Sequence, residues 1–203
     1  VRKRTVVIGH RRDLEAPGFP EATHAPKAAE GLLPYRTVGE VLLRVPAVPD
    51  MDGRFNEVRT RVGDRELPGA FSPRELHFSR TYQRISRERF AAIPEGGSRA
   101  DLPDELKAPC WRRHTTGSMD VMGRLHADRP SVTIRTEFFK PEKGRYLHPT
   151  ENRAITHYEA ALLQGFPGSH RFIGSRTAIA RQIGNAVPIP LGAAIARRLL
   201  EVL

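Results

Sequence analysis

The C-terminal end of the chain carries the sequence pattern that most constrains its fold. Pro190 is typical of the first turn of a helix, and the residues after it predict an amphipathic helix that runs toward the C-terminus. Its apolar residues recur at three- and four-residue spacing and are Leu191, Ala194, Ile195, Leu199 and Val202. Such a face needs a sheet or another helix to pack on, which this chain only partly supplies. We therefore expect this helix to dock on a larger structure.

Two shorter helices are predicted before it. Thr156 and Glu159 have the spacing of a capping box, and the glycine–proline signal at Gly165 ends that helix. A second helix is expected at residues 177–183, with Gly184 as its stop signal. The end of the chain is therefore expected to be helical and regular.

The rest of the chain is less regular. Residues 5–9 form a short β-branched run, which predicts a buried strand that leaves a sheet. From Pro17 to about Pro149, prolines and glycines recur every few residues, which favours a small irregular domain. Within it we expect short helices at residues 38–44 and 86–92 and a strand at residues 131–134.

The charge of the chain favours a polyanionic partner. Lys and Arg total 33 against 23 Asp and Glu, a net charge of +10, in a chain of 203 residues with 39% apolar content. Most of the basic residues are arginines, whose planar fork suits phosphate oxygens and guanine edges. Nucleic acid is the natural partner, because such an excess binds polyanions through counterion release. A solvated basic surface on a soluble protein is the alternative explanation of charge alone.

Several other classes of protein are disfavoured by composition. The single cysteine, Cys110, excludes an internal disulfide and a thiolate metal cluster. The eight histidines are scattered without an i,i+4 pair, so we expect no metal site. No apolar run approaches the ~20 residues of a membrane span, and the first residues lack a signal-peptide pattern. We expect no membrane association and a cytoplasmic location.

Three blocks of the sequence resemble the DNA (cytosine-5) methyltransferases. Residues 153–167 and 181–188 are similar to the last two conserved blocks of that family. Arg2-Lys-Arg4, running into residues 5–9, resembles the family's eighth block without its leading Gln. No segment matches the family's cofactor loop or its Pro-Cys-Gln nucleophile loop, which lie upstream of these blocks. We interpret the chain as a piece of such an enzyme, either truncated or a separate subunit.

The resemblance implies roles for particular residues. Arg4, with Arg2 beside it, would hold the flipped cytosine, because a fixed cation stabilises charge that develops on the ring. Thr133-Ile134 would lie on the DNA backbone, the hydroxyl of Thr133 bonding a phosphate. Asn185 and the backbone of Ala186 would border the pocket for S-adenosylmethionine. Without the resemblance, the arginines are more typical of a solvated strand end, and Gly-Asn is an ordinary helix stop. Thr133 is then about as typical of a buried strand threonine.

Two further features were considered for a role. Pro109-Cys110 echoes the nucleophile loop, but Trp111 follows where the family has Gln, and the position falls within the irregular domain. We predict that Cys110 is not the nucleophile and packs as a small hydrophobic residue in a core. The arginines of residues 79–90, interleaved with Tyr82 and Phe90, either follow phosphates or form the wet side of a helix, and we assign them no base contact.

The resemblance also implies a fold and a function. The expected fold is α/β, with the last strand and closing helices of a Rossmann-like methyltransferase large domain and an inserted irregular α+β target-recognition domain. The expected boundaries are 1–15 for the end of the large domain, 16–149 for recognition and 150–203 for the returning helices. The partners are double-stranded DNA and the missing N-terminal half, and the cofactor is S-adenosylmethionine. Two alternatives are a non-catalytic sequence-specific DNA-binding protein and a basic structural protein.

Overall fold

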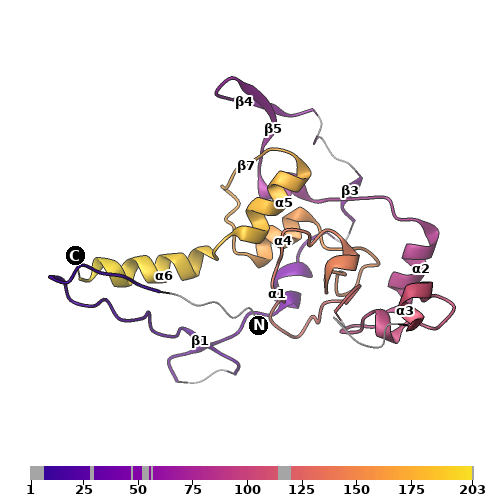
Figure 1. The fold of residues 1–203 in the computed structure, drawn as a ribbon, viewed down its shortest axis with the longest axis horizontal. Helices are drawn as coiled ribbons and strands as arrows, with labels where there is room; N and C mark the ends of the chain where they lie inside the picture. The colour runs from indigo at the N-terminus through magenta and orange to yellow at the C-terminus, as the bar shows by residue number, and fades with distance from the viewer. Residues whose placement is uncertain are drawn as a thin grey trace.

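The computed structural model describes residues 7–27, 30–46, 48–51, 55, 57–113 and 120–202. Short helices and strands are joined by long irregular segments in a mixed α/β structure (Figure 1). The helices are α1 (Val38–Leu42), α2 (Arg84–Ala92), α3 (Pro109–Arg113), α4 (His157–Leu163), α5 (Arg176–Asn185) and α6 (Ile189–Leu200). The strands are β1 (His24–Ala25), β2 (Leu33–Pro34), β3 (Asp50–Met51), β4 (Arg59–Val62), β5 (Arg65–Phe71), β6 (Phe78–Ser79) and β7 (Phe172–Ile173).

The largest sheet ties the C-terminal part of the chain to the middle. β4 and β5 form an antiparallel hairpin in which Arg59 lies opposite Pro68 and Val62 opposite Arg65. β7 pairs antiparallel with the other edge of β5. β1 with β2 and β3 with β6 make two small parallel pairs. The far end of the hairpin extends from the body of the molecule, whereas β7 leads directly into α5 (Figure 1).

The main core surrounds α4. Its capping box has Thr156 as N-cap, and its buried face packs with α1, α5 and the 3-10 turn Pro73–Leu76. The fully buried aromatic residues of this core come from distant parts of the sequence and are Phe71, Phe138, Tyr146 and Phe172. A smaller cluster packs beside α2 and contains Phe90, Ile93, Leu102, Met122 and Leu147. Burial of this apolar surface is the main source of stability for such short elements.

A buried arginine joins the irregular segments between the two clusters. Arg124 is 4% exposed, and its guanidinium donates to the carbonyls of Phe90 (2.5 Å), Ile93 (2.9 Å), His148 (2.7 Å) and Glu151 (2.8 Å) and to the side chain of Asn152 (2.8 Å). Burial lowers the pKa of Arg124, and the nearby carboxylates only partly offset this. These bonds replace a regular backbone ladder, because buried carbonyls need a donor from somewhere.

Helix α6 projects away from the rest of the molecule (Figure 1). It is amphipathic, yet none of its residues is buried, and Ile189, Leu191 and Leu200 are exposed. Its Arg198 approaches the N-terminal segment at Gly18, where a Cβ would lie 3.2 Å from the guanidinium. The helix predicted near Pro190 is therefore confirmed. Within the described part of the chain its apolar face is only partly covered, since Leu191 is exposed whereas Ala194, Ile195 and Leu199 are half-buried.

The other helix predictions are mostly confirmed. α4, α5, α1 and α2 appear close to their predicted positions, and Gly165 ends α4 at a φ of 78°. Gly184 does not stop α5, which continues to Asn185. No helix in the described ranges is long and apolar enough to cross a membrane.

Two strand predictions are not confirmed. Residues 131–134 are irregular, because Tyr146 supplies the hydrogen bond to the Thr133 carbonyl that a neighbouring strand would have made. Of the strand predicted at residues 5–9, residues 5 and 6 lie outside the described part of the chain. Residues 7–9 are irregular, with no described strand beside them to complete a ladder.

Candidate nucleic-acid interface and the adjoining turn

The loop of residues 133–136 contains the predicted DNA-backbone contact. Ile134 is 3% exposed and belongs to the main core, so it anchors the loop. Thr133 is half-buried, and its carbonyl accepts a hydrogen bond from the hydroxyl of Tyr146 at 2.9 Å. The backbone N–H of Arg135 donates to the same hydroxyl at 3.3 Å. The hydroxyl of Tyr146 therefore fixes the backbone of this loop, although the loop has no regular secondary structure.

The turn after α5 contains the predicted cofactor contacts. Asn185, the last residue of α5, is exposed, and Ala186 is half-buried. The N–H of Ala186 donates to the Ile183 carbonyl at 3.3 Å, so only its carbonyl remains for another partner. Gln164, the residue after α4, donates to the same Ile183 carbonyl at 2.8 Å and fixes the end of α5. The exposed amide of Asn185 can donate and accept, which fits the polar amino-acid part of a cofactor such as S-adenosylmethionine.

Gly184 brings the loop and the turn into direct contact. A Cβ added to this residue would lie 2.4 Å from the Thr136 nitrogen and 2.5 Å from the Arg135 carbonyl carbon. No side chain fits at these distances, so the end of α5 packs directly against the backbone of residues 135 and 136. Two segments predicted separately to bind DNA and cofactor are thus neighbours. The sequence predicts Gly184 only as a stop signal, although a glycine within a helical pattern can also have a packing role.

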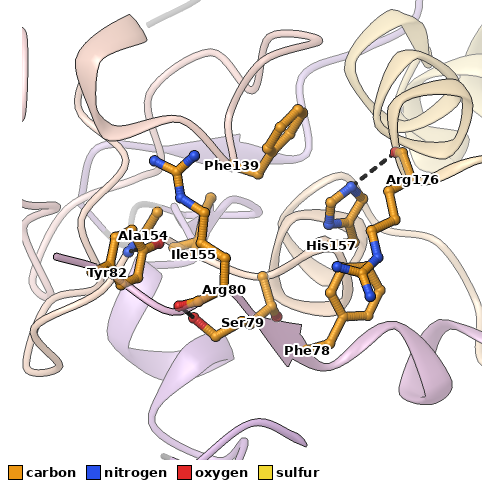
Figure 2. A pocket seen from close by; sticks show the side chains of 10 residues that line it. Phe78, Ser79, Arg80, Tyr82, Phe139, Ala154, Ile155, His157 and Arg176 are labelled. Carbon is orange, nitrogen blue, oxygen red and sulfur yellow. Dashed lines mark hydrogen bonds between the residues drawn. The ribbon is translucent and has the colours of Figure 1, made fainter. Parts of the chain in front are cut away.

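A small pocket lies beside α4 (Figure 2). Its volume is about 150 Å³, its walls include Phe78, Tyr82 and Phe139, and Arg80 lies at its edge with the guanidinium 5.0 Å from the Tyr82 ring centre. Typical ligand pockets have about 300–1,000 Å³, so this one is too small for a nucleotide. We assign it no ligand.

His157 lines this pocket from the first turn of α4. Its Nε2 lies 3.0 Å from the carbonyl oxygen of Arg176, so Nε2 carries the proton and donates (Figure 2). Burial lowers the pKa of His157 to about 4; the bond to the Arg176 carbonyl opposes this shift and the Arg176 charge adds to it. Its ring packs against Phe78, Phe138 and Phe139 at centroid distances of 4.9, 5.1 and 5.3 Å. His157 is a neutral structural residue at pH 7.

A buried ion pair fixes the start of α4. Arg153 donates to both carboxylate oxygens of Glu159, at 2.8 and 2.7 Å, and Glu159 is fully buried. Burial alone raises the pKa of Glu159, but the hydrogen bond and charge of Arg153 outweigh it, so that pKa is below its ordinary value. His148 lies 3.7 Å from Glu159, and burial lowers its pKa to about 4. The capping role of Glu159 is evident from the sequence, whereas its pairing with Arg153 is evident only in the structure.

The arginine-rich stretch divides between exposed and structural roles. Arg84 and Arg87 are exposed on α2, and Arg84 pairs with Glu88 at 3.1 Å. Arg89 instead donates to the Leu106 carbonyl at 2.7 Å and lies 4.9 Å above the Trp111 ring. The stretch therefore contains exposed arginines on a short helix and one arginine with a structural role.

The remaining predicted residues are placed as follows. Arg2 and Arg4 lie outside the described residues. Cys110 is exposed on α3, so the prediction that it packs in a core is wrong. The reason is that α3 contributes only Trp111 to the small cluster. In the ranges that the structure describes, no three His, Cys, Asp or Glu side chains are grouped so that they could hold a metal ion.

Comparison with known proteins identifies the relationships of the chain. A family model described as "C-5 cytosine-specific DNA methylase" matches residues 1–201. The chain is 31% identical to the type II methyltransferase M.NgoFVII of Neisseria gonorrhoeae, over 92% of this chain and 42% of the relative. It is 30% identical to M1.HphI of Haemophilus parahaemolyticus, over 100% of this chain and 44% of the relative. The type II methylase M.HgiDII of Herpetosiphon aurantiacus is 38% identical over 63% of the chain and 38% of the relative. The chain thus spans about two fifths of these relatives' length.

Proposed function

This chain belongs to the C-5 cytosine-specific DNA methylase family, and we propose that it is the C-terminal part of a DNA (cytosine-5) methyltransferase. The observation that carries the proposal is the contact, through Gly184, between the loop of residues 133–136 and the turn of residues 184–186. An enzyme that transfers a group from a cofactor to DNA needs its two binding segments side by side. The substrate is cytosine in duplex DNA, and the methyl donor is S-adenosylmethionine.

The division of labour follows from the order of the blocks. Residues 1–15 would end the Rossmann-like large domain, residues 16–149 would form the target-recognition domain, and residues 150–203 would return to the large domain. The exposed apolar residues of α6, which are Ile189, Leu191 and Leu200, support such a docking role. The partner surface, with the cofactor loop and the nucleophile, would come from the remaining part of the enzyme. This chain would act on DNA in the cytoplasm.

The chemistry proposed for the whole enzyme uses residues of both parts. A thiolate of the remaining part would add to C6 of a flipped cytosine, and S-adenosylmethionine would supply the methyl group to C5. Loss of the C5 proton and elimination of the thiolate from C6 would then restore the aromatic ring and free the enzyme. Arg4, supported by Arg2, holds the ring on which charge develops. Thr133 contacts the DNA backbone while the buried Ile134 anchors its loop, and Asn185 with the Ala186 carbonyl would hold the polar end of the cofactor. S-adenosylmethionine supplies only the methyl group.

Duplex DNA binding by this chain alone tests the recognition role. With about four phosphate contacts, we expect affinity to fall by about a hundredfold between ~50 and ~200 mM salt, because bound counterions are released. Fluorescence anisotropy with a labelled duplex measures this, and circular dichroism at each salt concentration checks that the chain is folded. A folded chain that binds no duplex DNA at low salt, or binds it equally at both concentrations, contradicts the recognition role.

Complementation tests the catalytic role. We expect no methyl transfer by this chain alone, and transfer when a fragment with the family's cofactor loop and nucleophile loop is added. Incorporation of labelled methyl groups from S-adenosylmethionine into DNA measures it. The Cys110→Ser variant is the control and should complement as well as the original chain, since Cys110 is exposed on α3. Transfer by this chain alone that Cys110→Ser abolishes would overturn the proposed division.

A further inference from the structure

The backbone of residues 133–136 is immobilised by two independent contacts. The Tyr146 hydroxyl bridges the Thr133 carbonyl and the Arg135 N–H, at 2.9 and 3.3 Å. Gly184 packs against residues 135 and 136 so closely that a Cβ would be 2.4–2.6 Å from their backbone atoms. Ile134, which lies between the two residues bonded by Tyr146, is itself buried in the main core. The loop therefore holds one backbone position although it is not itself part of a helix or a sheet.

Arg135 presents an uncommitted cation on this fixed loop. Its side chain is exposed, and among the described residues its guanidinium makes no hydrogen bond or ion pair. The nearby carboxylate of Glu137 does not compete for it, because Lys140 binds Glu137 at 2.5 Å and Lys143 lies 3.6 Å away. A cation whose backbone is already ordered loses less entropy on binding an anion than one on a mobile loop. This arrangement suits a rigid, repeated anion such as a DNA phosphate.

We propose that Arg135 is a contact to a DNA phosphate and that Gly184 is its positioning residue. This inference rests on the proposed function, since duplex DNA is the anion. Arg135 donates its guanidinium N–H groups to the phosphate oxygens, a charge-assisted bond for which its fork is suited. Gly184 sets where Arg135 lies relative to the turn at Asn185, because any side chain at position 184 pushes the loop away from α5. The DNA contact and the cofactor turn thereby share one rigid support.

The experiment measures duplex DNA affinity of the full chain as a function of salt. Arg135→Ala should weaken binding about tenfold, on the scale of one charge-assisted hydrogen bond. It should also reduce the slope of log K against log salt by about 1, as expected for the loss of one phosphate contact. Gly184→Ala should cause a similar loss and a similar change in slope. A purely structural role for Gly184 changes the melting temperature but leaves the salt slope of the folded protein unchanged.

Two matched controls separate these effects from charge and helix propensity. Arg197→Ala removes another exposed arginine, from α6, and should change affinity less than twofold. Gly192→Ala alters a helical glycine that has no atom within 4 Å of an added Cβ, so binding should not change. If Gly184→Ala fails to fold, Tyr146→Phe replaces it, because this change removes only the hydroxyl that bridges residues 133 and 135.

A double-mutant cycle decides whether Gly184 acts through Arg135. In the Gly184→Ala background, or in Tyr146→Phe, Arg135→Ala should cost less than twofold further. Full additivity of the two losses overturns the positioning role. An Arg135→Ala affinity and salt slope equal to those of the original chain overturn the phosphate contact while the proposed function stands. Absence of duplex binding by the original folded chain overturns both.

Discussion

Replacing Glu159 by Gln is expected to lower the free energy of unfolding by about 3–5 kcal/mol, the cost of leaving one partner of a buried ion pair uncompensated. Arg153 is 7% exposed and loses both of its bonds to a charged oxygen, at 2.8 and 2.7 Å. Gln retains the shape of Glu and can still accept from the Thr156 N–H, so the loss isolates the charge. Urea unfolding at pH 7, followed by far-UV circular dichroism, measures the change.

The chain contains a matched control for this substitution. Glu40 occupies the same position in the capping box of α1, where Thr37 N–H donates to its carboxylate at 2.8 Å, but this box is exposed. Glu40→Gln should change the free energy of unfolding by less than about 0.5 kcal/mol, because Gln also serves in a capping box. Equal effects of Glu40→Gln and Glu159→Gln would show that the buried pair adds nothing beyond the cap.

Local sequence signals explain why the C-terminal helices could be predicted. The Thr156 cap, the glycine at 165 and the apolar spacing after Pro190 each act within a few residues, and all three appear in the structure. The end of α5 was misjudged because Gly184 serves a contact with a loop almost fifty residues earlier in the sequence. The only sign of this long-range contact in the nearby sequence is the glycine itself.

The middle of the chain was harder to predict, because side chains replace backbone pairing there. Arg124 bonds four carbonyls and one side chain from residues 90–93 and 148–152, and nothing near it in the sequence indicates these partners. Tyr146 likewise substitutes for a strand neighbour of Thr133. The candidate site residues Thr133, Ile134, Asn185 and Ala186 were identified by resemblance alone. Their proximity, and the role proposed for Arg135, required the structure.

Two buried histidines, His148 and His157, should make the free energy of unfolding depend on pH between about 4 and 6.5. Burial lowers the pKa of both His148 and His157 to about 4, whereas an unfolded chain has histidines near 6.5. The Thr150 and Glu151 N–H groups donate to Nδ1 of His148, at 3.3 and 3.1 Å, so this nitrogen must stay unprotonated. Because their folded pKa values are depressed, the stabilisation is complete above pH 6.5 and is lost as the pH falls toward 4.

Lowering the pH from 7 to 5 is therefore expected to reduce the free energy of unfolding by about 2 kcal/mol for each of these histidines. The reason is that pH 5 lies about 1.5 units below the pKa of an unfolded histidine, and each unit corresponds to about 1.36 kcal/mol. Urea unfolding at pH 7, 6 and 5 measures the slope, which corresponds to two protons taken up on unfolding. His157→Gln should remove one proton from that slope, because Gln can still donate to the Arg176 carbonyl but does not titrate. Equal free energies of unfolding at pH 7 and pH 5 would mean that neither ring is buried in its neutral form, and that the packing of α4 against Phe78, Phe138 and Phe139 does not exclude the charged imidazole.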